Sequence, residues 1–97
     1  MGEVVHRPRI KKTRYAIQYA ETVLMYPTKA HKHNGVQTYY AKVTISAFGP
    51  REIEKMMSLK VGDRVMVYGI LSERFRTEGR DVRINVTSID KNNDIEI

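Results

Sequence analysis

Aromatic and basic side chains share one face of the clearest predicted strand, residues 36–48. The residues that would face a core occupy its odd positions, namely Tyr39, Ala41, Val43, Ile45 and Ala47. Tyr40, Lys42 and Phe48 occupy even positions and would face solvent. A solvent-facing ring can stack on a nucleic-acid base, and a neighbouring lysine can contact a phosphate. These three residues are therefore candidate nucleic-acid ligands, although the two rings could instead cap a barrel or fill a subunit interface.

A second group of candidates surrounds the loop between the last two predicted strands. A phenylalanine among arginines suits base stacking combined with phosphate contact. If the hairpin were only a solvated turn, exposure of that ring would contribute nothing to folding. The candidates in this group are Arg74, Phe75, Arg76, Arg80 and Arg83. Three earlier cations could also follow a phosphate backbone, or could equally belong to a solvated face: Arg14, Lys29 and Lys32.

The sequence lacks the residue sets that catalysis or metal binding requires. It has no cysteine, which excludes disulfides, thiolate ligands and a cysteine nucleophile. His31 and His33 form a His-x-His pair with no third ligand nearby. We find no Ser/His/Asp set, paired carboxylates, phosphate-binding glycine loop or HExxH motif. We therefore predict a protein that is not an enzyme and that uses no cofactor and no metal.

The charge of the chain suggests an acidic partner. Lys and Arg total 17 against 11 Asp and Glu, so the formal net charge is +6. Residues 1–14 contain five basic residues and one acidic residue, which accounts for +4 of that total. Nucleic acid is the commonest partner of such a domain, and an anionic membrane surface is the second. The alternative is that the charge only maintains solubility.

Length and composition indicate one small domain rich in strands. A chain of 97 residues has room for a single core. Val, Ile and Thr number 26, whereas Ala and Leu number 8, and β-branched side chains favour pleated sheets over helices. No apolar run suggests a membrane span or a signal peptide. We therefore expect the protein in solution in the cytoplasm and predict no membrane partner.

The hydrophobic pattern predicts five strands and one helix. Residues 3–10 would form an edge strand or an arm because Pro8 cannot donate to a ladder. A strand over 15–26 shows a phase slip typical of a β-bulge or a sharp bend, and a turn would follow over 27–35. Strand 36–48 precedes a helix over 50–59, and strands over 64–75 and 80–89 follow, with a bend at Gly69. We divide the chain into a basic arm or edge strand (1–14), a domain (15–90) and a polar tail (91–97).

This order of elements predicts an all-β fold of the OB class. An OB fold is a five-stranded Greek-key barrel, and here one short helix would lie between strands 3 and 4. An SH3-like barrel is the nearest competitor but normally lacks a helix at that position.

Several short motifs in residues 40–89 occur in an order and spacing typical of one protein family. They are Phe48-Gly49, Leu-Lys-Val-Gly-Asp-Arg-Val at 59–65, Tyr-Gly-Ile-Leu at 68–71, Arg-Phe-Arg at 74–76 and Gly-Arg at 79–80. In this half the chain resembles bacterial-type single-stranded DNA-binding proteins and their small relative, primosomal replication protein N. It departs from them in having no tryptophan, so tyrosine and phenylalanine would have to stack on bases. Its short tail also lacks the aspartate run and final Pro-Phe of the larger members.

The resemblance and the residues together predict a function. We expect sequence-independent binding of single-stranded DNA in replication, repair or recombination, by electrostatic capture followed by base stacking. The resemblance also implies a homodimer or homotetramer and contacts with replication or primosome proteins. Two alternatives remain open, which are an RNA-binding OB module and a protein-interaction or assembly subunit whose positive charge is incidental.

Overall fold

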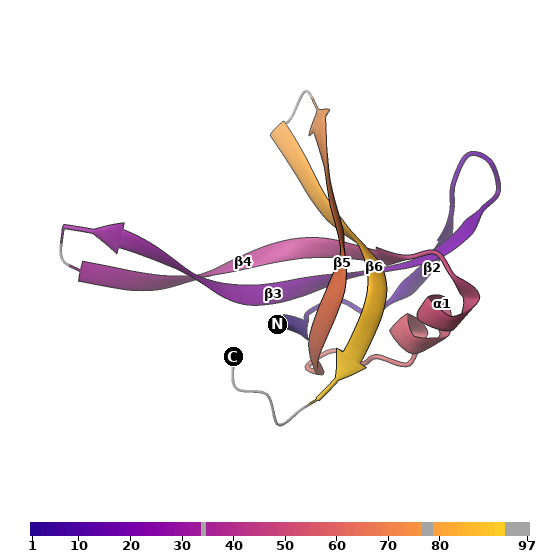
Figure 1. Ribbon diagram of the computed structural model, residues 1–97, viewed down its shortest axis with the longest axis horizontal. Coiled ribbons are helices and arrows are strands. Elements are labelled where there is room, and N and C mark those ends of the chain that lie inside the picture. Colours follow the sequence, from indigo (N-terminus) through magenta and orange to yellow (C-terminus); the bar gives the residue numbers. More distant parts are fainter. Residues whose placement is uncertain (34, 77–78, 93–97) are drawn as a thin grey trace.

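The computed structural model describes residues 1–33, 35–76 and 79–92, which form six strands and one helix (Figure 1). The side chains of Ala30, Lys32, 74–76, 80 and 81 are not part of this description. The elements are β1 (Gly2–Val4), β2 (Arg9–Lys12), β3 (Gln18–Lys32), β4 (Gly35–Ala47), α1 (Pro50–Met57), β5 (Arg64–Arg76) and β6 (Gly79–Lys91).

Five of these strands close into a barrel. β1 pairs with β3 on one side and with β5 on the other, which joins the two ends of the order β1-β5-β6-β4-β3. β4 and β6 run parallel, and the other pairs are antiparallel. The predicted five-stranded barrel with one helix is confirmed. The helix position was wrong by one strand, because segment 3–10 divides around Pro8 into β1 and β2, so that α1 lies between the fourth and fifth strands.

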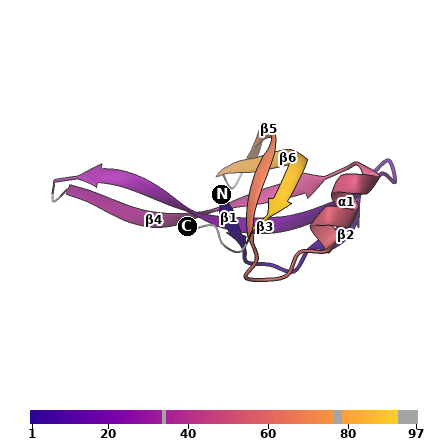
Figure 2. The same cartoon turned by 60° about the horizontal axis from the view of Figure 1, so that its bottom comes forward.

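The barrel interior holds one apolar core. Ile45, Val4, Val65 and Met56 are fully buried there, and the other members are Ala20, Leu24, Ala47, Leu59, Val86 and Ile89. Met56 belongs to α1, which packs on β3, β4 and β6. Pro50 suits the first helical turn because its missing N–H would be unpaired there. The helix therefore covers one end of the barrel, opposite the direction in which the β3–β4 hairpin extends (Figure 2).

Two long hairpins leave the barrel (Figure 1). β3 and β4 stay paired from Ala20↔Ala47 to Lys32↔Gly35, so the predicted turn over 27–35 is much shorter than expected. Beyond Met25 no described strand flanks the second edge of β3, and a proline is tolerated where its missing N–H faces such an edge. Pro27 therefore does not end the strand. Tyr39, predicted to face the core, is 38% exposed because this part of the hairpin lies outside the barrel.

The start of β3 also differs from the prediction. Residues 13–17 form a tight turn in which the Thr13 N–H donates to the Ile17 carbonyl at 2.9 Å. The Thr13 hydroxyl oxygen accepts the N–H groups of Tyr15 and Ile17, each at 3.2 Å. Ala16 has a φ of 63°. The register from Ala20 onward is continuous, so of the two predicted causes of the phase slip in segment 15–26 the bulge was wrong. The chain instead turns sharply at residues 13–17.

The N-terminal segment contributes to the barrel rather than only to its edge. Val4 is fully buried, and the Val4 N–H donates to the Asp63 carbonyl at 2.9 Å. β2, in contrast, pairs with β3 alone among the described strands. The division of the chain at residues 14 and 90 stays a prediction, and residues 93–97 of the tail lie outside the described residues. Within the described ranges no helix has the length and apolarity needed to cross a membrane.

A β-bulge between Tyr68 and Gly69 shifts the register of β5 against β6, which confirms the predicted bend. A Cβ built on Gly69 would overlap the backbone carbonyl of Asn85. We expect Gly69→Ala to lower the free energy of unfolding by about 1–3 kcal/mol, because the overlapping atoms belong to backbone and cannot rotate away. Thermal unfolding should show a fall in Tm of several degrees. Ser72→Ala on the same strand is the control, and an unchanged Tm for Gly69→Ala would contradict this account.

Candidate nucleic-acid interface

The outward side of β3, β4 and β6 forms a continuous surface. Ala20, Thr22 and Leu24 are buried, so the odd-numbered residues of β3 point outward. The register places Glu21 opposite Ser46, and Met25 opposite Lys42. The parallel pairing places Arg83 beside Thr44. We call this surface the outer face and define it by Tyr19, Glu21, Tyr40, Lys42, Phe48 and Arg83, together with Ser46, which has the same parity but is fully buried.

Two aromatic rings stack at one end of the outer face. The centroids of Tyr19 and Phe48 are 5.0 Å apart, and the ring planes differ by 20°. Phe48 follows the last residue of β4 and remains 44% exposed. The stack holds the phenylalanine ring in place while leaving part of its surface open. Phe48 therefore lies on the non-core side, as its parity predicted.

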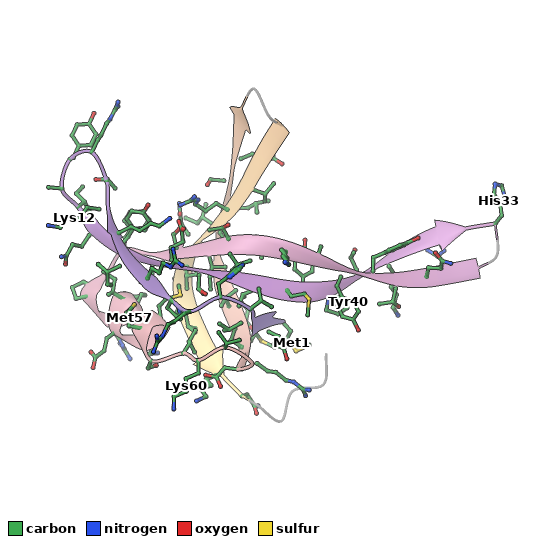
Figure 3. The ribbon with its side chains drawn as sticks, turned by 180° about the vertical axis from the view of Figure 1, so that it is seen from behind. Met1, Lys12, His33, Tyr40, Met57 and Lys60 are labelled. Carbon is green, nitrogen blue, oxygen red and sulfur yellow. The ribbon has the colours of Figure 1, made fainter. Side chains whose placement is uncertain are left out.

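Tyr40 and Lys42 continue the outer face along the β3–β4 hairpin. Tyr40 is 63% exposed and lies between the barrel and the hairpin tip at His33 (Figure 3). Lys42 is exposed two residues closer to the barrel. At about 3.3 Å per residue, Tyr40 and Phe48 are about 26 Å apart along β4. Binding sites of OB folds for single strands span about 4–16 nucleotides.

Charged groups cluster in the middle of the outer face. One oxygen of the Glu21 carboxylate is 2.7 Å from the Lys11 ammonium, and the other is 2.8 Å from an Arg83 guanidinium nitrogen. The same nitrogen donates to the Ser46 hydroxyl at 3.3 Å. Side chains from β2, β3, β4 and β6 therefore meet at one point. Arg83 enters this network through its side chain, which is 29% exposed.

The turn over residues 13–17 presents another aromatic and basic pair. The Arg14 guanidinium lies 5.0 Å from the centroid of the Tyr15 ring, within the range of a cation–π contact. Tyr15 is 72% exposed. Arg14 is therefore positioned by its own neighbour and lies on this turn, apart from the strands of the outer face.

The structure unites some of the predicted ligands and leaves others apart. Tyr40, Lys42, Phe48 and Arg83 share the outer face, and Lys29 is exposed at the same parity farther along β3. The backbones of Lys32, Arg74, Phe75, Arg76 and Arg80 belong to strands, but their side chains lie outside the described residues. The binding role of every predicted ligand stays a prediction.

Sequence reasoning missed five residues of this surface and its surroundings: Lys11, Tyr15, Tyr19, Glu21 and Ser46. Tyr19 was recognisable in principle, because the register of β3 against β4 brings it beside Phe48. Tyr15 follows a candidate cation directly, and the cation–π contact depends on the turn. Lys11 lies in the basic segment 1–14, and its place beside the outer face depends on its contact with Glu21. Within the described ranges no three His, Asp or Glu side chains gather to hold a metal ion.

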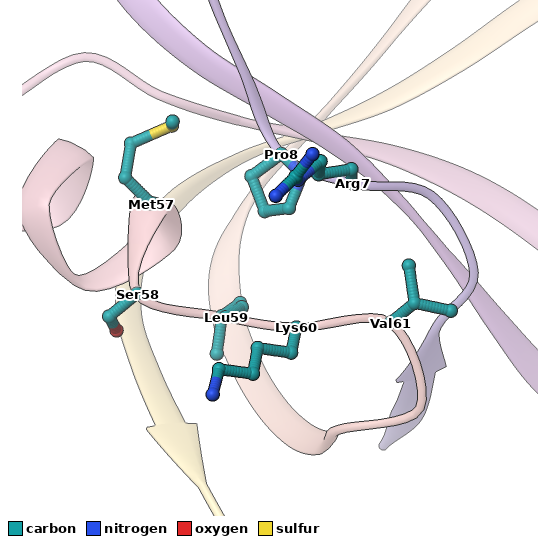
Figure 4. Close-up of a pocket in the computed structure, with 7 residues that line it drawn as sticks. All are labelled: Arg7, Pro8, Met57, Ser58, Leu59, Lys60 and Val61. Carbon is teal, nitrogen blue, oxygen red and sulfur yellow. The ribbon is translucent and has the colours of Figure 1, made fainter.

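A pocket of about 550 Å³ lies elsewhere, between the segment Arg7–Pro8 and residues 57–61 (Figure 4). Leu59 and Pro8 are buried within it, whereas Arg7 and Lys60 bring positive charge to its rim. It shares no lining residue with the outer face. None of the predicted ligands whose side chains are described lines it.

Solved structures with the same architecture cover most of this chain. The small single-stranded DNA-binding protein from Streptomyces coelicolor matches with a TM-score of 0.71 at 21% identity, over 94% of this chain and 88% of that chain. The PriB protein from Ralstonia solanacearum matches with a TM-score of 0.67 at 12% identity, over 93% and 90%. The Plasmodium falciparum single-stranded DNA-binding protein, in complex with single-stranded DNA, matches with a TM-score of 0.68 at 19% identity, over 93% and 86%.

The chain has the OB fold of the single-stranded DNA-binding proteins. The predicted fold class is thereby confirmed, and so is the resemblance that the motifs of the second half indicated, at the level of structure. No protein-family model and no curated protein matches the sequence. At identities of 11–21%, the OB fold is the property that these neighbours share with this chain.

Proposed function

We propose that this OB-fold protein binds single-stranded DNA, largely without sequence preference, in replication, repair or recombination. One observation carries the proposal: the Tyr19–Phe48 stack, Tyr40 and Lys42 lie on one side of adjacent strands. Stacking on aromatic rings accepts every base, and cations beside the rings contact the backbone. Two of the neighbouring folds belong to proteins described as binding single-stranded DNA, which supports the same assignment.

Binding would proceed in two steps. The net charge of +6 draws the polyanion to the surface, and lysines and arginines then replace condensed counterions on the phosphates. Bases subsequently stack on Phe48 and Tyr40, which are exposed before binding. The protein itself supplies binding and orientation only. We therefore propose a non-enzymatic role without a cofactor, in the cytoplasm, with contacts to other replication or primosome proteins.

We also propose a homodimer or homotetramer. Tyr68, Ile70 and Leu71 of β5 are 55%, 68% and 60% exposed. In the described register β1 covers the edge of β5 only at Arg64 and Val65. Neighbouring exposed apolar side chains beside an open strand edge are typical of a subunit contact.

Strand preference tests the proposed function directly. The protein should bind a dT 30-mer at least about tenfold more tightly than a duplex of equal length, because a duplex hides both faces of each base and forfeits about 1–3 kcal/mol of stacking per base. Fluorescence anisotropy with both probes measures the ratio. Equal affinities for the single strand and the duplex would indicate a generic basic protein rather than one that stacks unpaired bases. Competition by rU 30-mer at equal strength would favour the RNA alternative, and binding to none of the probes would favour an assembly subunit.

A further inference from the structure

Glu21 places a negative charge in the middle of the outer face. Its two oxygens contact Lys11 at 2.7 Å and Arg83 at 2.8 Å. The Glu21 side chain is only 15% exposed, whereas those of Lys11 and Arg83 are 46% and 29% exposed. The two cations therefore shield the carboxylate from solvent while remaining accessible themselves.

This arrangement halves the positive charge that a phosphate would meet. Lys11, Arg83 and Glu21 together carry a net charge of +1, whereas the two cations alone carry +2. A phosphate that contacts Lys11 or Arg83 competes with Glu21 for the same N–H donors. Close charges on a partly exposed surface interact appreciably. The free energy lost when a cation leaves Glu21 therefore offsets most of the free energy gained when the cation contacts a phosphate.

We propose that Glu21 is an intramolecular competitor of the nucleic-acid phosphate and sets the affinity of the outer face. The inference deepens the proposed function and rests on it. In the free protein the carboxylate holds Lys11 and Arg83 together, and in the complex a phosphate takes over one or both cations. The consequence is a moderate affinity for single-stranded DNA, which allows the strand to be released or transferred to another protein.

Removal of the charge at Glu21 should strengthen binding. Glu21→Gln keeps the size of the side chain, but its single amide oxygen can accept from only one of the two cations. Because Lys11 and Arg83 are both partly exposed to solvent, the fold should persist. We expect a three- to tenfold gain in affinity for a dT 30-mer at low salt. A gain of this size corresponds to the removal of one local charge interaction, the competition of the Glu21 carboxylate with a phosphate. The slope of log affinity against log salt should steepen by about 0.7 for each phosphate contact that is added.

Asp90→Asn is the matched control. It makes the same change in net charge at an exposed position seven residues from Arg83 on β6. That separation is about 20 Å along the strand, which exceeds the Debye length of about 10 Å at 0.1 M salt. This control should change neither the affinity at 0.1 M salt nor the slope. A gain equal to that of Glu21→Gln would reduce the effect to net charge and overturn the proposal.

Glu21→Asp separates competition from positioning. It retains the charge but shortens the reach, so competition predicts no gain in affinity. If Glu21→Gln and Glu21→Asp both weaken binding, Glu21 positions the cations and the competitor role is wrong. If neither the unmodified protein nor Glu21→Gln binds, the proposed function itself fails. Binding by the unmodified protein without a gain in Glu21→Gln overturns only the competition.

A measurement on the unmodified protein makes the test independent of variant folding. The Arg83 guanidinium resonances should shift on titration with a dT 30-mer as the contact to Glu21 is exchanged for one to phosphate. Saturation with unshifted Arg83 and Lys11 side-chain resonances would overturn the proposal.

Discussion

The affinity for a dT 30-mer is expected to fall by about 100-fold between 50 and 200 mM salt. The logarithm of affinity decreases by about 0.7 per single-strand phosphate contact for each tenfold rise in salt, and about five contacts give a slope near −3.5. The charge of +6 and the exposed positions of Lys29 and Lys42 make this number of contacts reasonable. Anisotropy titrations at four or five salt concentrations measure the slope.

Titrations in sucrose at the same osmolarity provide the control for this prediction. An uncharged solute releases no counterions, so affinity should change little in sucrose. A flat salt dependence would contradict electrostatic capture and would leave stacking as the main source of affinity. A steep dependence that is the same for duplex and single strand would instead indicate a generic basic surface.

Loss of Tyr40 on β4 and of Phe48 directly after it should nearly abolish single-strand binding. Tyr40→Ala and Phe48→Ala should each weaken affinity by about 1–3 kcal/mol, because each ring would lose its stacking with one base. The double variant should lose the sum if the rings act independently. They are eight residues apart along the chain, so direct coupling is not expected.

Stability measured on the same variants separates binding from folding. Tyr40 is 63% exposed, so its loss should leave Tm nearly unchanged. Loss of Phe48 removes its stack on Tyr19, which should cost about 0.5–1.5 kcal/mol. A core phenylalanine would instead cost about 3–5 kcal/mol, and a Tm loss of that size with normal affinity would remove Phe48 from the interface.

Tyr39→Ala is the matched control for both rings. Tyr39 precedes Tyr40 on the same strand but has the opposite parity, and its hydroxyl donates to the Gln37 side chain at 2.6 Å. If the outer face alone binds DNA, this variant should keep normal affinity. An equal loss at Tyr39 and Tyr40 would mean that the strand wraps around the hairpin rather than following one face. Phe75 is the third predicted ring, and its role stays a prediction.

Local rules accounted for most of the elements. The alternation in β4 placed Ile45 and Ala47 inside and Phe48 outside, because successive side chains of a strand point to opposite sides. Pro50 after Gly49 marked the start of α1. Gly69 marked the bend in β5, because only a residue without Cβ lets the Asn85 backbone approach so closely.

The sequence by itself therefore determined the centres of the main strands and the start of the helix, which parity of β4 faces outward, and that the chain carries excess positive charge. Only the tertiary structure decided which outward residues meet. The pairing of Tyr19 with Phe48 depends on the register of β3 against β4, and the contacts of Glu21 bring Lys11 and Arg83 together across 72 residues of chain. Alternation and propensity are local properties, whereas register and barrel closure depend on packing between distant segments. For that reason the rings and cations could be predicted individually, and the carboxylate that restrains the cations could not.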